Sequence, residues 1–190
     1  RRAARGGRGV RASGPDNASS YAAYRRELVQ TRVPGATRSA LFMGVVLQNL
    51  FLILDYIAFP EFFTQFLATR MLINLGFGIC YLGRNRFPRS AMIGSGYTLG
   101  LGMLALIFAH GATTMPYYTG LILVFFGMGV MLPFSTIEAS LVAGSLAGVF
   151  ALAAFLDGGG ANTAYHFSTF FVLGAAAETV FCSAFLDRMR

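Results

Sequence analysis

The chain has 190 residues, of which 55% are hydrophobic and 12% are charged, and its mean hydropathy is +0.60. A soluble domain usually carries about a quarter charged residues, so the composition excludes an ordinary water-soluble enzyme. The apolar residues fall in runs of roughly 20, the length needed to cross about 30 Å of hydrocarbon. The sequence therefore predicts an all-α, polytopic membrane protein.

The basic residues are concentrated at the N-terminus. The whole net charge of +7 is carried by residues 1–38, which hold nine arginines against Asp16 and Glu27. Residues 1–20 are rich in Arg, Gly, Ala and Ser without apolar periodicity, which predicts a disordered basic tail. No aromatic residues are interleaved with these arginines. We therefore favour a solvated tail over one that binds specific lipids or nucleic acid.

An interfacial pre-helix is predicted over residues 21–38. Tyr21, Tyr24 and Leu28 recur at helical spacing, which is typical of a short helix lying at the membrane surface. The Pro-Gly pair at 34–35 is expected to break this helix before the first membrane span.

Residues 39–190 are predicted to form a bundle of six transmembrane helices. The spans lie at about 39–59, 62–82, 91–110, 116–133, 139–156 and 165–186. The N-terminal region, the second loop and the C-terminus hold fourteen of the fifteen arginines, and the first, third and fifth loops hold none. By the positive-inside rule we expect both termini to be cytoplasmic.

Three charged residues fall inside the predicted spans: Asp55, Arg70 and Glu178. Such charges cost about 2.5–3.5 kcal/mol each on insertion scales, so they usually face the bundle interior and have partners. The short turn between the first two spans brings Asp55 within reach of Arg70. Two interpretations stay open here. One is a structural ion pair that holds the helical hairpin, and the other is a ligand site, because an arginine fork matches carboxylate and phosphate groups.

Further polar residues extend this polar core. Gln48 shares a face of the first span with Asp55, and Asn74 shares a face of the second span with Arg70. We therefore predict a polar seam between the two helices. Glu178 is expected to be satisfied inside the bundle as well.

A ligand pocket is predicted near the outer ends of the spans. Its candidate binding residues are Arg70, Asp55, His110, Tyr117, Tyr118 and His166. All of them lie near one membrane level by their position in the spans. A small amphiphilic or anionic ligand fits this mixture, whereas the alternative is an aromatic belt without a pocket. Because two histidines without a spacing motif are weak support for a metal or haem, we expect no metal and no cofactor.

Gly96 with Gly100, and Gly144 with Gly148, have the small-xxx-small spacing that lets membrane helices pack closely. We expect them to pack within one chain, with a dimer face as the alternative. The sequence lacks GxSxG, HExxH, P-loop and CxxC motifs, so catalysis by these residues is not expected.

The order of several short motifs resembles that of a known family. They are an arginine-containing pre-helix (Tyr24, Arg25), Asp55 followed by Pro60, Arg70 early in the second span, a YYTGL segment (Tyr117, Tyr118, Gly120, Leu121), and the sequence Leu132, Pro133, Phe134, Ser135. This order resembles the six-span N-terminal sensor domain of bacterial histidine kinases and class III adenylate or guanylate cyclases, over residues 20–190. Phe134 departs from the family, whose members tend to carry Trp there. A second departure is that no kinase, cyclase or coiled-coil segment follows Arg190 in the sequence.

The resemblance implies a homodimeric receptor in the bacterial inner membrane. It would detect a small or membrane-soluble signal and transmit it through the sixth span to a cytoplasmic kinase or cyclase domain outside this sequence. Gly174 and Glu178 would lie on that span. The alternative is a structural or accessory membrane subunit of a larger complex. A catalytic domain encoded after Arg190 would favour the receptor, and a stop codon would favour the subunit.

Overall fold

The computed structural model describes residues 16–109, 118–156 and 163–189, and these residues form helices and short connections without a strand. The elements are α1 (Asp16–Ala58), the 3-10 turn η1 (Pro60–Phe62), α2 (Phe63–Gly83), α3 (Pro88–Ala109), α4 (Tyr118–Met131), α5 (Thr136–Leu156) and α6 (Thr163–Met189). The predicted all-α class is therefore confirmed. The apolar character of these helices indicates a membrane protein.

Five of the described helices are long and apolar enough to cross a membrane, where the sequence predicted six. The exception is α4, which has 14 residues and is therefore about 21 Å long at 1.5 Å per residue. It ends early because Pro133 follows and has no N–H to continue the helix. The predicted beginning of this span at residue 116 lies outside the described residues.

The first helix differs from its prediction. Asp16–Ala58 is one continuous helix of 43 residues that includes Pro34, so residues 16–20 are helical rather than part of a disordered tail. Val33 and Thr37 are buried in the bundle, so the later part of the predicted interfacial segment is packed. We attribute the continuity to this packing on both sides of Pro34, which offsets the single backbone hydrogen bond that proline removes.

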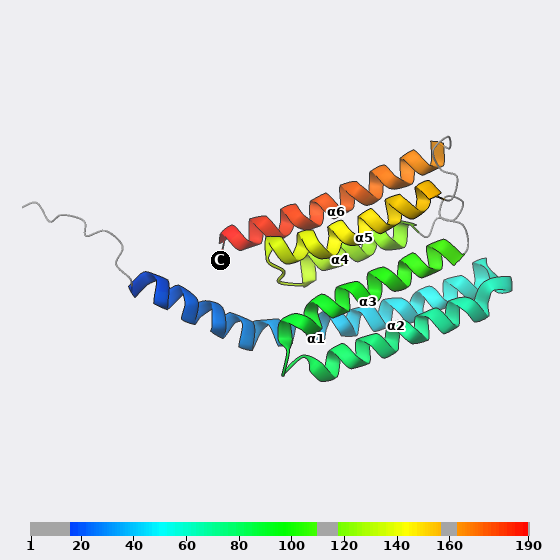
Figure 1. Cartoon of the computed structure of the whole chain (residues 1–190). Helices are drawn as coiled ribbons and strands as arrows, with labels where there is room; N and C mark the ends of the chain where they lie inside the picture. Colours follow the sequence, from blue (N-terminus) through cyan, green and yellow to red (C-terminus); the bar gives the residue numbers. More distant parts are fainter. Residues whose placement is uncertain (1–15, 110–117, 157–162, 190) are drawn as a thin grey trace, which may run out of the picture.

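The helices are arranged as two groups of three (Figure 1). One group contains α1, α2 and α3, the other contains α4, α5 and α6, and α3 packs against both α4 and α5. The main core lies between the groups and includes Ile107, Phe125, Val142 and Phe150, all of them fully buried. The entry of α1 into the bundle, the α2–α3 and α4–α5 connections and the end of α6 lie at the same end of the bundle (Figure 1).

Small residues allow the groups to pack closely. A Cβ atom at Gly100 would lie 2.3 Å from the Leu146 side chain, so any larger residue there would have to displace Leu146 from its place between α3 and α5. Thr179 Oγ1 of α6 donates to the Phe125 carbonyl of α4 at 2.9 Å. The predicted packing within one chain is confirmed for Gly100. Gly144 and its partner Gly148 instead lie on the outer surface with no atom near their Cβ positions.

The beginning of α5 is capped by its own first turn and by α6. Ser135 Oγ accepts from the Glu138 amide at 3.3 Å, and Glu138 Oε2 accepts from the Ser135 amide at 2.8 Å, which is a capping box. Asp187 Oδ2 accepts from the Thr136 amide at 2.9 Å. This last bond ties the end of α6 to the start of α5.

Candidate functional site

The centre of the site is an ion pair between the first two helices. Asp55 lies one turn before the end of α1, and η1 reverses the chain so that Arg70 of α2 lies opposite it. Arg70 Nε donates to Asp55 Oδ2 at 2.6 Å, and both side chains are 2% exposed. The ion pair predicted from the sequence is confirmed.

Two more contacts orient the guanidinium group. Arg70 Nη1 donates to Gln48 Oε1, and Gln48 lies about two helical turns before Asp55 on α1. The Phe51 ring centroid lies 5.7 Å from Arg70 Cζ, within the range of a cation–π contact. The third nitrogen, Nη2, is buried and has no hydrogen-bond partner in the described part of the chain. The pair therefore retains one unused donor group.

A cavity of about 160 Å³ lies beside this ion pair. Its lining combines Asp55 and Arg70 with uncharged residues of α1, α3 and α4 and with the residue that follows α1. These are Phe51, Leu54, Ala58, Phe59, Met103, Thr119 and Gly120. The buried charges thus face a space bounded by four helices, α1 to α4, from both halves of the bundle.

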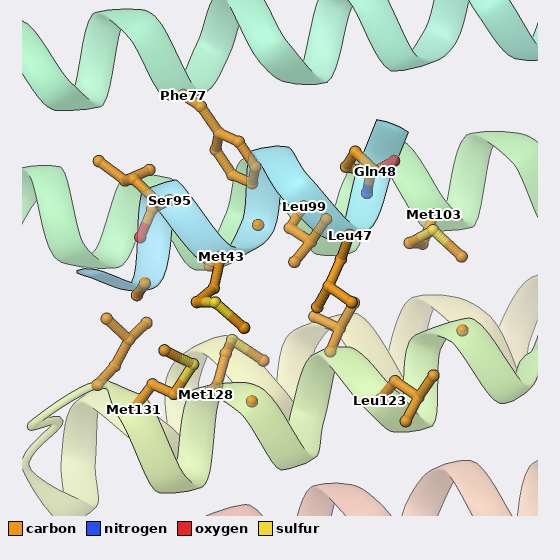
Figure 2. A pocket seen from close by; sticks show the side chains of 18 of the residues that line it. Met43, Leu47, Gln48, Phe77, Ser95, Leu99, Met103, Leu123, Met128 and Met131 are labelled. Carbon is orange, nitrogen blue, oxygen red and sulfur yellow. The ribbon is translucent and has the colours of Figure 1, made fainter. Parts of the chain in front are cut away.

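A second, larger cavity of about 220 Å³ continues along the bundle between α1, α3 and α4. Figure 2 shows Met43 and Leu47 of α1 facing Met128 and Met131 of α4. Gln48 lies on the same stretch of α1. The two cavities share Phe51, Met103 and Gly120 in their linings. They therefore adjoin each other and form an apolar space with the ion pair at one end.

The larger cavity opens sideways between α1 and α4. Three of its lining residues are well exposed: Met43 at 41%, Leu47 at 46% and Leu123 at 57%. If the helices span a bilayer, this opening faces the lipid chains. An apolar molecule could then enter the cavity from the membrane without passing through water.

The other predicted site residues lie elsewhere. Tyr118 packs against the main core and does not line either cavity. His166 is exposed and its ring contacts Tyr165 with a centroid distance of 5.1 Å. His110 and Tyr117 lie outside the described residues. Asp55 and Arg70 are therefore the predicted ligand-binding residues that the described structure brings together at a cavity.

The predicted polar core is corrected in one respect. Gln48 belongs to it, and Asn74 Oδ1 is buried without a hydrogen-bond partner in the described part of the chain. Glu178 does not belong to it, because its side chain is exposed on the outer surface of α6. A helical rotation of about 100° per residue separates it from its buried neighbour Thr179.

The sequence analysis missed the apolar part of the site. Its lining is built of methionine, leucine and glycine side chains that any membrane helix could carry. One available signal was the glycines of α4, because Gly120 and Gly127 both line the larger cavity. Glycines on one helix leave space beside its backbone, and this space remains as a cavity where the facing helix does not approach closely enough to fill it.

Comparisons of the chain with protein-family models, with curated proteins and with solved structures find no match. The geometry of the two cavities and of the ion pair therefore carries the functional argument.

Proposed function

We propose that this chain is a membrane receptor domain that binds a small lipophilic molecule in the space between α1, α3 and α4. The observation that carries the proposal is that an apolar cavity open between two helices adjoins a buried ion pair with an unused donor. Ligand sites are usually apolar cavities with a few polar groups that orient the ligand.

The proposal includes six crossings with both ends of the chain in the cytoplasm. The described arginines near the connections, Arg84, Arg86 and Arg89, lie at the end of the bundle where α6 also ends (Figure 1). One end rich in arginine is typical of the cytoplasmic side. In this orientation α4 is a short fourth span that completes the six crossings, and the Arg70–Asp55 pair lies toward the outer side.

We further propose that two copies associate through α6. Glu178 is exposed, although it lies eleven residues before the end of α6 and hence about 16 Å from that end along the helix. A carboxyl group at this depth is costly when it faces lipid. Gly174 and Ala177 beside it are exposed as well, so a second helix can approach closely there. A partner helix would shield Glu178 and supply it with hydrogen bonds.

The direction of signalling follows from the contacts of α6. It packs against α4, which lines the cavity, through Thr179 and Phe125, and against the start of α5 through Asp187. A ligand that displaces α4 changes the surface on which α6 rests. In the proposed receptor, a cytoplasmic kinase or cyclase domain, as the family resemblance implies, would respond to the new position of α6.

The proposal is tested by filling the cavity. Gly127 lines the larger cavity and has open space at its Cβ position, whereas Gly144 has open space on the outer surface. Gly127→Leu should therefore block the cavity, and Gly144→Leu serves as the matched control. A ten-carbon alkyl diazirine is crosslinked to the full chain in lipid nanodiscs, and the labelled residues are located by mass spectrometry.

We expect the original protein and Gly144→Leu to be labelled at cavity residues such as Met103 and Met128, which are buried from lipid. Gly127→Leu should lose this labelling at least fivefold and retain labelling of outward-facing side chains. Labelling confined to outward-facing side chains in the original protein would refute the binding site.

A second candidate function is a structural subunit of a larger membrane complex. It is favoured by the length of α1, because 43 residues form a helix of about 65 Å that extends past the ends of the other helices (Figure 1). Such a projection offers a surface to a partner protein. Purification that yields a single protein species, together with cavity labelling, would favour the receptor over the subunit.

A further inference from the structure

We infer that the ligand of this site is an uncharged lipophile that carries a hydrogen-bond-accepting oxygen, such as a ketone, ester, amide or lactone carbonyl. This inference rests on the proposed receptor function and specifies the chemistry of its ligand. The sequence alone favoured an amphiphilic or anionic ligand, because Arg70 carries a positive charge. The structure instead favours a neutral ligand, because Asp55 compensates that charge.

The positive charge of Arg70 is compensated by Asp55 at 2.6 Å, with both side chains buried. No other acidic or basic side chain is among the described residues that line the two cavities. A carboxylate or phosphate ligand would therefore bring an uncompensated negative charge into a buried, apolar site, which is strongly unfavourable.

Of the guanidinium nitrogens, Nε is used by Asp55 and Nη1 by Gln48, while the buried Nη2 has no partner in the described part of the chain. Buried donors without a partner are uncommon and costly. A carbonyl oxygen would accept a hydrogen bond from Nη2 without changing the net charge of the site. An ammonium group, which has no acceptor, would gain nothing there.

The cavity of about 160 Å³ places Arg70 at one end, and the adjoining cavity of about 220 Å³ is lined mainly by apolar residues. A cavity of about 150 Å³ holds one benzene molecule, so the larger cavity takes roughly nine carbon atoms. The ligand thus has a polar oxygen at one end and an apolar body of this size. It enters from the lipid between Met43 and Leu123, both of which are exposed.

The test compares three probes with the same chain of ten carbons: 2-decanone, decanoate and decane. Equilibrium binding of each radiolabelled probe to the full chain in lipid nanodiscs is measured at pH 9, where decanoate is ionised. Partitioning into empty nanodiscs is subtracted. We expect 2-decanone to bind at least tenfold more tightly than decane, which is the effect of satisfying one buried hydrogen-bond donor. Decanoate should bind at least tenfold more weakly than 2-decanone.

Substitution of the compensating acid should reverse the preference. Asp55→Asn leaves the Arg70 charge without its carboxylate, so decanoate should then bind more tightly than 2-decanone. Glu61→Gln is the matched control, because Glu61 is an exposed acid on η1 that lines neither cavity. This control should keep the original preference. If Asp55→Asn fails to fold, the comparison of the three probes on the original protein still decides.

Each outcome has a separate meaning. Equal binding of 2-decanone and decane, or tighter binding of decanoate, would overturn the inference on ligand chemistry and leave the receptor proposal standing. If none of the three probes binds above the empty nanodiscs, both the inference and the proposed binding site are wrong.

Discussion

Removing one member of the Arg70–Asp55 pair should destabilise the protein far more than removal of an exposed charge does. Arg70→Leu leaves the Asp55 carboxylate without its cation, and Asp55→Asn leaves the guanidinium without its anion, in positions that are 2% exposed. Loss of one partner from a buried pair costs about 3–5 kcal/mol. Each single substitution should therefore consume a large part of a folding free energy that is typically about 5–15 kcal/mol.

The double substitution should cost less than the sum of the two single ones. In Arg70→Leu with Asp55→Asn neither charge remains, so no buried ion lacks a counter-ion. We expect a coupling free energy of about 2–3 kcal/mol, near the upper end of the range for groups in direct contact. Gln48 would still lack its Arg70 donor, so the double variant should remain less stable than the original protein.

The assay is a double-mutant cycle on free energies of unfolding, measured for the full chain by reversible unfolding in lipid bicelles. The pair of Arg89 and Glu138 is the matched control. Its Nε–Oε1 distance is 3.7 Å and Arg89 is 46% exposed. Exposed pairs contribute about 0–1 kcal/mol, so the control cycle should give a coupling below about 1 kcal/mol.

Additive effects of Arg70→Leu and Asp55→Asn, within about 0.5 kcal/mol, would refute the pair. An equal coupling in the control cycle would refute the claim that burial is what makes the inner pair strong.

Three further predictions follow from the contacts between helices and from the proposed topology. Gly129→Ala should be at least about 1 kcal/mol less stable than Gly144→Ala in thermal unfolding, because a Cβ at position 129 would lie 3.3 Å from the Thr179 backbone. Equal stability of the two variants would contradict this close approach. Asp187→Ala should accelerate hydrogen exchange at the Thr136 amide about tenfold, through loss of a capping acceptor; unchanged exchange would contradict the cap. A cysteine at position 85, in a variant without native cysteines, should react with an impermeant maleimide only in inverted vesicles, and labelling in right-side-out vesicles would reverse the proposed orientation.

Local features of the sequence determined the helices and one long-range contact. Runs of apolar residues placed α2, α3 and α5 within a few residues of their observed bounds, because helix formation in an apolar segment depends on composition and neighbouring residues. The contact of Asp55 with Arg70 was predictable as well. Only the short turn η1 separates their helices, so helical spacing alone brings the two side chains to the same level.

The bounds of α1 and α4 differ from those that the local sequence predicts. A Pro-Gly pair predicts a break at 34–35, yet burial of Val33 and Thr37 against the rest of the bundle keeps α1 continuous. The early end of α4 at Met131 follows from Pro133 and was visible in the sequence, but hydropathy alone extended the predicted span past it.

Only the tertiary structure decided which faces of the helices are inside and where space remains between them. Hydropathy is similar all around a membrane helix, so the sequence could not show that Glu178 points outward or that Met43 faces Met128. The size of a cavity depends on the volume that the helices enclose and on the volume that their side chains fill. Residues from four separate helices, α1 to α4, line the larger cavity. Charge and helical spacing act within one segment and could be read along the chain, whereas packing acts between segments distant in sequence.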